Sequence, residues 1–278
     1  MRRKEFTKRY YDGTEYKFIV EEFRDYKDVI DTIESREYQF DKGAINGHSP
    51  KFYGGVENWE EAKELFLYGW NKPDALKKMA ATIRKIERQA ERQAISFKND
   101  IVGFAPNVAH AVIGLPHNMI NSQRQPKRQK VVTINAGVEF SASVDASDVF
   151  EWGAKLAGTI MNIEKSGYRV RLNLVNQYSR LDISNRMIEV MSLTAKKENQ
   201  PFDIKRLLFP LAHAAKQRMI EFEWYRKVPG GVEHAGYGMP MNKYTKSQRK
   251  LISDAICDEP NSYYIAYGDD IEKVLNLK

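Results

Sequence analysis

The sequence predicts an α/β protein in which helices flank a mixed or parallel sheet, and three observations support this class. A strand, or a strand pair broken at 135–137, is predicted at 131–144 and is followed directly by a helical pattern at 145–167 and an alternating strand pattern at 168–178. This order of strand, helix and strand is typical of a right-handed parallel crossover. A chain of 278 residues, 42% of them hydrophobic, is long enough to bury a sizeable core. The single cysteine, Cys257, excludes an intramolecular disulfide, so that core has to stabilise the fold.

The first third of the chain is predicted to be mostly helical after one strand at 15–23. A helix is predicted at 58–69, where the pattern begins with an N-cap asparagine and ends at a glycine. A second helix, at 74–98, has apolar residues three and four positions apart with many basic residues between them. We therefore expect an N-terminal α+β region with a basic helix at 1–99 and an α/β core domain at 100–278.

The rest of the chain predicts shorter elements around the central crossover. Residues 100–120 are rich in Gly, Pro and small apolar residues and are expected to form an irregular buried connector. The other expected elements are a strand at 187–195, a helix leading into a strand at 201–225 with an interruption at Pro210, a polar helix at 245–258, an aromatic strand at 262–270 and a helical turn at 271–278.

Basic residues outnumber acidic ones by 44 to 37, which gives the chain a formal charge of +7. An excess of this size favours acidic or polyanionic partners without requiring them. The basic residues gather on the helix predicted at 74–98 and in the loop at 124–130, which makes nucleic acid a candidate partner, with a solvated basic surface as the alternative. The residues concerned are Lys77, Arg84, Lys85, Arg88, Arg92, Arg124, Lys127, Arg128 and Lys130.

The sequence contains no segment that would direct the chain out of the cytoplasm. No apolar run approaches the ~20 residues that span a bilayer. The basic start of the chain is not followed by the apolar stretch of a signal peptide. Because a single cysteine also fits a reducing compartment, we expect a cytoplasmic protein without a membrane partner.

The segment GVEFSASV at 137–144 carries the clearest candidate chemistry. In a strand, Glu139, Ser141 and Ser143 would lie on one face. A carboxylate and two hydroxyls are oxygen ligands of the kind that Mg²⁺ takes. Hydroxyls that alternate along a half-exposed strand are also ordinary, so a structural role stays open and is the favoured interpretation.

Other catalytic patterns are missing from the sequence. The five histidines form no zinc-enzyme pattern, and there is no G-x-S-x-G, no phosphate-binding loop and no G-x-G-x-x-G. His213, within an apolar helical pattern, is expected to be a hydrogen-bonded core residue. An enzyme is therefore the less favoured interpretation, and no cofactor other than Mg²⁺ is suggested.

Four segments, 52–70, 103–119, 153–172 and 203–222, resemble an uncharacterised family of proteins from tailed bacteriophages and prophages. Their more distinctive parts are the Trp, Ala and Gly-Trp pattern at 59–70 and a G-L-P-x-x-M motif. The resemblance implies a phage-encoded protein in the cytoplasm of an infected bacterial host. It implies no functional residues.

The strand–helix–strand unit is also similar to a von Willebrand A-type domain, a Rossmann-like fold whose metal site begins with D-x-S-x-S. This resemblance implies an Mg²⁺ site at Glu139, Ser141 and Ser143, with a further acid at Asp269 or Asp270. Glu139 stands where such domains have Asp, which lengthens the ligand arm. A Rossmann-like fold without a metal is the alternative.

Three functional hypotheses follow. The leading one is a non-enzymatic phage accessory protein that binds a host or phage macromolecule as an interaction module, with a homo-oligomer also open. The second is nucleic-acid binding through the basic helix at 74–98 and the loop at 124–130, with an affinity that falls steeply with salt. The third is a metal-dependent von Willebrand A-like module.

Overall fold

The computed structural model describes residues 1–10, 13–40, 51–91, 98–102, 105–121, 131–179, 186–231, 233 and 244–275. The strands are β1 (Arg2–Arg9), β2 (Glu15–Phe23), β3 (Lys98–Asp100), β4 (Ala105–Pro106), β5 (Met119–Asn121), β6 (Val131–Gly137), β7 (Arg169–Tyr178), β8 (Met187–Lys196) and β9 (Ser262–Ile265). The helices are α1 (Tyr26–Glu34), α2 (Trp59–Tyr68), α3 (Pro73–Glu91), α4 (Val108–Val112), α5 (Ala146–Lys165), α6 (Ile204–Ala212), the π-helix η2 (Lys216–Glu221), α7 (Phe222–Arg226), α8 (Lys246–Ile256) and α9 (Ile271–Leu275).

Six of these strands form a mixed sheet in the order β1-β2-β8-β7-β6-β9. β6, β7 and β9 run parallel, β2 and β8 also run parallel, and the two groups meet antiparallel at β7 and β8. β6, α5 and β7 form the parallel crossover that the sequence predicts. β6 has β7, the next strand along the chain, as its neighbour on one side and β9, from the end of the chain, on the other. The chain therefore leaves β6 toward one side of the sheet and later returns to the other side. This makes the carboxyl end of β6 a topological switch point.

The N-terminal third begins with two strands, so the prediction of a mostly helical region was wrong. β1 and β2 pair antiparallel from Arg2 with Glu22 to Arg9 with Glu15, and β2 adds to β8 of the main sheet. β1 was missed because most of its residues are charged, and strand formation there depends on pairing with β2 more than on intrinsic preference. The division into domains at residue 99 stays a prediction.

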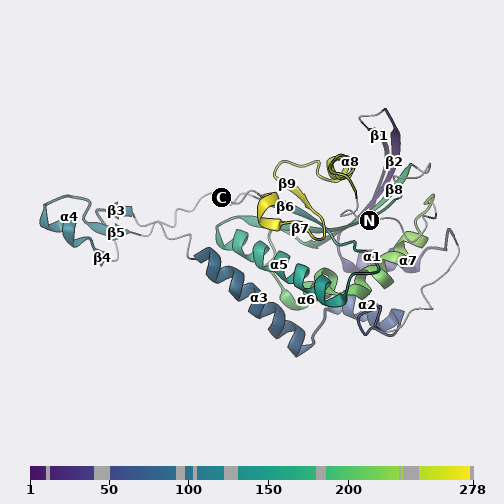
Figure 1. Ribbon diagram of the computed structural model, residues 1–278, viewed down its shortest axis with the longest axis horizontal. Helices are drawn as coiled ribbons and strands as arrows, with labels where there is room; N and C mark the ends of the chain where they lie inside the picture. Colours follow the sequence, from purple (N-terminus) through teal and green to yellow (C-terminus); the bar gives the residue numbers. More distant parts are fainter. Residues whose placement is uncertain are drawn as a thin grey trace.

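Helices cover one face of the six-stranded sheet, and α3 lies outside α5 (Figure 1). Leu172 and Leu174 of β7 share a continuous core with Leu156 of α5, and all three side chains are buried. Gly153 allows α5 to approach α6, since a Cβ at this position would lie 2.4 Å from the Leu211 carbonyl oxygen. This face supplies most of the hydrophobic core.

In the described ranges, α8 covers part of the opposite face of the sheet (Figure 1). Leu251 and Ile252 of α8 pack there with Phe18, Val175 and Val190 from three strands. Toward the amino ends of β6 and β7, the side chains on this face are polar and border a groove. The sheet therefore has one fully covered face and one half-open face.

The segment after α6 continues as helix, and the predicted strand near 220–225 was wrong. α6 contains Pro210 and ends at Ala212, close to the predicted interruption. The chain then forms η2, in which every residue is buried, and α7. A segment that is buried on all sides lacks the periodicity that separates a helix from a strand, which explains the error. π-helices are rare and frequently mark functional sites.

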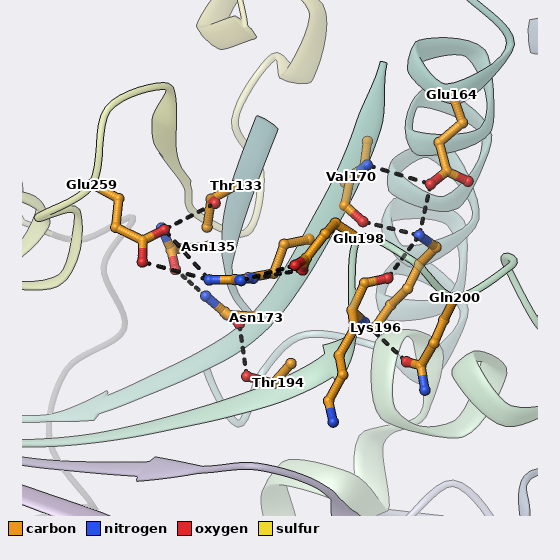
Figure 2. A network of polar contacts seen from close by, with 12 residues as sticks. Thr133, Asn135, Glu164, Val170, Asn173, Thr194, Lys196, Glu198, Gln200 and Glu259 are labelled. Atoms are coloured by element: carbon orange, nitrogen blue, oxygen red, sulfur yellow. Dashed lines mark hydrogen bonds and ion pairs between the residues drawn. The ribbon is translucent and has the colours of Figure 1, made fainter. Parts of the chain in front are cut away.

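A buried lysine connects the end of α5 to the sheet. The Lys196 ammonium, at the end of β8, donates to the Glu164 carboxylate at 2.6 Å and to the Val170 carbonyl oxygen at 2.9 Å (Figure 2). Only 2% of the Lys196 side chain is exposed, so these bonds compensate the desolvation of its charge.

A second buried charge connects β1 and β2 to the helices. The Glu21 carboxylate, in β2, accepts hydrogen bonds from Arg36 and from Trp224 Nε1, each at 2.8 Å, and from Arg3 at 2.9 Å. Burial alone would raise the pKa of Glu21, but the hydrogen bonds from Arg36, Trp224 and Arg3 outweigh it and hold the pKa below its ordinary value. Glu21 is therefore ionised and joins four segments of the chain.

Replacing Glu21 with Gln should lower the free energy of unfolding by about 3 kcal/mol, because two guanidinium groups lose their buried counter-charge. Urea unfolding at neutral pH measures this change. Glu5→Gln is the matched control, since Glu5 binds the same Arg3 at the surface at 2.8 Å and should shift the midpoint little. Equal shifts in the two variants would contradict a special role for Glu21.

Candidate functional site

A cluster of polar side chains is buried at the carboxyl ends of β6 and β9, beside the switch point. Glu139 follows β6 by two residues, and its Oε1 accepts a hydrogen bond from the Tyr264 hydroxyl of β9 at 2.9 Å. Gly137 leaves the space for this contact, because a Cβ there would lie 2.3 Å from the Tyr264 hydroxyl oxygen. We call Glu139, Tyr264, Lys216, Glu221 and Asn176 the switch-point cluster.

Glu139 is the titratable centre of the switch-point cluster. Its side chain is buried, and its Oε2 has no hydrogen-bond partner in the described part of the chain. Burial raises the pKa of Glu139 to about 7, although the Tyr264 hydroxyl and the charges of Lys216 and Arg249 oppose the rise. Near neutral pH the carboxyl group therefore exists in both protonation states. Carboxyl groups of this kind occur at functional sites.

The π-helix contributes an ion pair to the same cluster. Lys216 and Glu221, the first and last residues of η2, are paired and buried. Asn176 Nδ2 of β7 donates to Glu221 and to the Tyr178 hydroxyl, while Asn176 Oδ1 has no partner among the described residues. Burial lowers the pKa of Lys216 well below its ordinary value, and the charge of Glu139 offsets this in part.

Arg218 of η2 holds the loop that follows Glu139. Its Nη2 donates to the carbonyl oxygens of Ala142 at 3.3 Å and Val144 at 3.1 Å. The guanidinium also lies 4.1 Å from the centre of the Phe52 ring. The loop therefore turns its carbonyl groups toward an arginine.

The cavity beside the switch-point cluster is small. It has a volume of about 10 Å³, enough for about one water molecule, and is lined by Lys216, Trp152, His213 and Tyr267 among others. Trp152 Nε1 is buried without a partner among the described residues. The arrangement can hold and exchange a proton, but it leaves no room for an organic substrate.

The structure brings together only part of the predicted metal-ligand set. Glu139 and Asp269 lie at the ends of neighbouring strands, as the von Willebrand A resemblance implies. Asp269 accepts from Arg249 at 2.5 Å and from the Ala266 N–H at 2.8 Å. Since β6 ends at Gly137, the hydroxyls of Ser141 and Ser143 lie in a turn, where they bond to each other at 3.1 Å.

No group of three or more His, Cys, Asp or Glu residues suited to a metal ion occurs in the part of the chain that the structure describes. Mg²⁺ binding at the predicted residues stays a prediction. His213 is a hydrogen-bonded core residue, as expected. Its Nδ1 accepts from the Ala215 N–H at 3.1 Å, and burial lowers its pKa to about 4.

The predicted basic surface is described in part. Lys77, Arg84 and Lys85 are exposed on α3, whose Met79 and Ile83 are buried in the main core. Arg88 belongs to α3 by its backbone. Arg92, Arg124, Lys127, Arg128 and Lys130 lie outside the described residues.

Residues 98–121 form a small module, which we call the arm, that projects away from the rest of the protein (Figure 1). The arm contains the three-stranded sheet β3-β5-β4 and α4. The prediction of a buried connector was wrong, because no described side chain from 99 to 120 is buried. The large exposed aliphatic side chains of the arm are Ile101, Val102, Val108, Val112, Ile113 and Leu115.

Polar contacts hold the arm together in place of a core. Asn107 Nδ2 donates to Asn99 Oδ1 at 3.0 Å, and Asn99 Nδ2 lies 3.2 Å from His110 Nδ1. The Asn107 N–H donates to the Asn118 carbonyl oxygen at 2.7 Å. These bonds fix the backbone and leave the aliphatic side chains facing outward.

Sequence reasoning missed the Lys216–Glu221 pair and the exposure of the arm. Opposite charges among the many apolar residues of the segment 211–224 were the available signal for a buried pair. The Gly, Pro and small apolar residues at 100–120 were interpreted as a buried connector, but such a segment fits a protein interface equally well.

The sheet and its helices define an α/β protein with a mixed six-stranded sheet. The chain belongs to the family described as Domain of unknown function (DUF7192), whose model matches residues 7–276. This match shows no link to bacteriophages or to von Willebrand A-type domains. No significant match was found among curated proteins or among solved structures. None of the helices in the described ranges combines the length and apolar character needed to cross a bilayer.

Glu139→Gln should change how stability depends on pH. The ordinary pKa of Glu139, 4.5, rises to about 7 in the folded protein, so its contribution to stability falls as pH rises between these values, by about 3 kcal/mol in total. His213 acts in the opposite sense, because its pKa falls from 6.5 to about 4 and its contribution is lost as pH decreases through that range. In the natural protein the two slopes oppose each other.

Urea unfolding between pH 4.5 and 7.5 tests this prediction. Glu139→Gln removes the first slope and keeps an acceptor for Tyr264, so its stability should rise with pH between about 4 and 6.5. Glu151→Gln, at an exposed position of α5, is the control and should keep the profile of the natural protein. A Glu139→Gln profile identical to that of the natural protein would contradict the raised pKa.

Proposed function

We propose that this protein is an interaction module that self-associates through the arm. The observation that carries the proposal is the set of six exposed aliphatic side chains on a module without a buried side chain among its described residues. Val112 and Ile113 are 79% and 69% exposed. A concentration of exposed apolar side chains is typical of a protein interface, because water solvates them poorly.

The charge distribution favours a second copy of the chain as the partner. Residues 101–123 contain no Asp, Glu, Lys or Arg, although the whole chain carries a charge of +7. Two copies can therefore meet through this segment without bringing like charges together. Contact between basic surfaces elsewhere on two copies would bring like charges together. The arm spans 98–121, a length that matches the roughly 20–30 residues on one side of a standard interface.

The energetics are sufficient when both arms contribute. Fully burying a Val, Leu or Ile side chain is worth about 1.5–3 kcal/mol. Six such side chains from each arm supply on the order of 20 kcal/mol if most of their exposed area is covered. Association costs an estimated 4–15 kcal/mol, because the two partners lose translational and rotational freedom. A symmetric dimer of arms is therefore favourable, whereas one arm against a polar surface is not.

The double substitution Val112→Asp and Ile113→Asp should dissociate the dimer, since two buried carboxylates in each arm would lose their hydration without gaining a partner. Sedimentation velocity over about 1–100 μM measures the mass, a range suited to dissociation constants near 1 μM. We expect a dimer for the natural protein and a monomer for the variant.

Tyr68→Asp provides the matched control. Tyr68 is 79% exposed, as is Val112, but it lies at the end of α2. This variant should remain a dimer. A natural protein that is monomeric throughout the range, or a dimer that survives the double substitution, would refute association through the arm.

Nucleic-acid binding is a second proposal, and the exposed cations of α3 favour it. Lys77, Arg84 and Lys85 form no ion pair among the described residues, unlike Lys27 and Lys250, which pair with Asp31 and Asp254. Unpaired cations on one helix suit phosphate contacts, because each contact releases counterions.

Replacing Lys77, Arg84 and Lys85 with Gln should weaken binding to a fluorescein-labelled duplex, whatever its sequence. The slope of log affinity against log salt should fall by about 1 for each of these cations that binds a phosphate in the natural protein. Fluorescence anisotropy between 50 and 200 mM salt measures both quantities. The control is a triple variant with Gln at Lys27, Lys246 and Lys250. Equal effects of the two triple variants would contradict a site on α3, since they would show only a nonspecific attraction between the basic protein and the duplex.

The finer parts of the sequence hypotheses also remain proposals. Expression from a bacteriophage in an infected bacterial host rests on the sequence resemblance of four segments. A metal-dependent von Willebrand A-like role rests on Glu139 and Asp269, which follow the neighbouring strands β6 and β9 but are already engaged by Tyr264 and Arg249. The arm provides stronger support for an interaction role than either resemblance does.

A further inference from the structure

The open half of the sheet contains a groove with a free volume of about 160 Å³. Its floor comes from β6, β7, β8 and β9, and the chain after α8 forms one wall. The polar floor residues are Thr133, Asn135, Asn173, Ser192, Thr194 and Ser262. This volume is far larger than that of the one-water cavity beside the switch-point cluster, and it suits a small ligand or one unit of a larger one.

Hydrogen bonds fix the orientation of the floor side chains (Figure 2). The Thr194 hydroxyl donates to Asn173 Oδ1 at 3.2 Å, and Asn173 Nδ2 donates to Asn135 Oδ1 at 2.9 Å. Asn135 Nδ2 then donates to the Ser262 hydroxyl at 2.8 Å. This ladder crosses four strands, and Asn173 keeps one N–H and one lone pair that bond to no other residue in the described part of the chain.

Packing requirements alone do not account for a polar floor. Where α8 covers the same face, the strands present Val175, Ile188 and Val190. On β7 the side chains on this face change from Arg171 and Asn173 to Val175 along one strand. The change from polar to apolar coincides with the boundary of α8, so the uncovered half is built to contact water or a polar ligand.

Both cations at the edge of the groove, Lys4 and Arg171, are already paired with carboxylates, and the edge carries a net negative charge because Asp258 also borders it. Arg171 donates to Glu198 at 3.0 Å and to Glu259 at 3.5 Å. Lys4 pairs with Glu22 at 2.5 Å. An anionic ligand would have to displace these carboxylates, so the groove favours a neutral one.

Among the residues that the structure describes around the groove, Phe6 is the one aromatic. A nucleobase or a single strand of nucleic acid would gain little stacking there. A ligand with neighbouring hydroxyl groups would match the floor better. Each hydroxyl group can both donate and accept a hydrogen bond, as the alternating amide and hydroxyl groups of the floor require.

We propose that this groove binds a neutral polyhydroxyl ligand, a sugar residue, through Asn173, Ser192 and Thr194. The Asn173 amide binds one hydroxyl group of the sugar as acceptor and another as donor. Ser192 and Thr194, on β8, bind the adjacent positions. The affinity for a single sugar is expected in the millimolar range, in keeping with about a dozen non-hydrogen atoms.

Saturation-transfer NMR on the full chain tests the proposal. The probes are the methyl glycosides of glucose, galactose, mannose and N-acetylglucosamine at about 10 mM, with inorganic phosphate and adenosine monophosphate as charged comparators. We expect a signal from at least one glycoside and a weaker response to both comparators. No signal from any glycoside, or a stronger response to phosphate or the nucleotide, would overturn the proposal.

Two variants locate the binding. Ser192→Leu fills the groove and should abolish the glycoside signal, since among the described residues the Ser192 hydroxyl has no hydrogen bond to lose. Thr194→Val keeps the side-chain shape but removes the hydroxyl group, so it should weaken glycoside binding at least fivefold. This variant tests the proposal even if Ser192→Leu does not fold. Ser143→Leu, in the turn after Glu139, is the control and should bind normally. Unchanged binding in Thr194→Val and in folded Ser192→Leu would overturn the assignment to this groove.

Discussion

The packing of the six-stranded sheet against α5, α6, η2 and α7 is the interaction on which the other features depend. It buries one face of the sheet completely and brings the ends of β6, β7 and β9 against the π-helix. Charged groups that fall inside this layer need partners to offset the loss of hydration, and Glu21 and Lys196 have them. Glu21 binds two arginines and Trp224, and Lys196 binds Glu164. These bonds help to fix how the helices and strands are arranged, because each connects elements that are distant in the sequence.

The same packing closes the place where an α/β protein usually binds its ligand. The switch point of an open sheet is commonly a binding crevice, but here Glu139, Lys216 and the loop held by Arg218 fill it, and the remaining cavity holds about one water molecule. A carboxyl group with a pKa near 7 in such a closed site can sense protons without contacting a substrate. Recognition has to take place on surfaces that the helices do not cover.

The sequence predicted the elements whose local pattern agrees with their environment. The crossover 131–178, the helix capped by Asn58 and the core position of His213 are examples. It failed where tertiary contacts decide. β1 is a strand because β2 pairs with it, and η2 shows no period because it is buried on all sides. Glu139 was recognised as a candidate from its spacing, but its burial and its neighbour Lys216 depend on contacts between residues far apart in the chain, which spacing does not report.

The two uncovered surfaces have opposite chemistry, and this argues that they have different tasks. The arm presents aliphatic side chains without charge, so its driving force is removal of apolar surface from water. The groove presents amides and hydroxyls, whose binding energy depends on direction and is small unless the ligand matches them. The arm returns to the body at β6, where Thr133 and Asn135 belong to the groove, so the two surfaces lie next to each other along the chain. Association through the arm would therefore multiply the number of grooves in one particle, and weak binding to each groove would be strengthened by multivalency without any new contact.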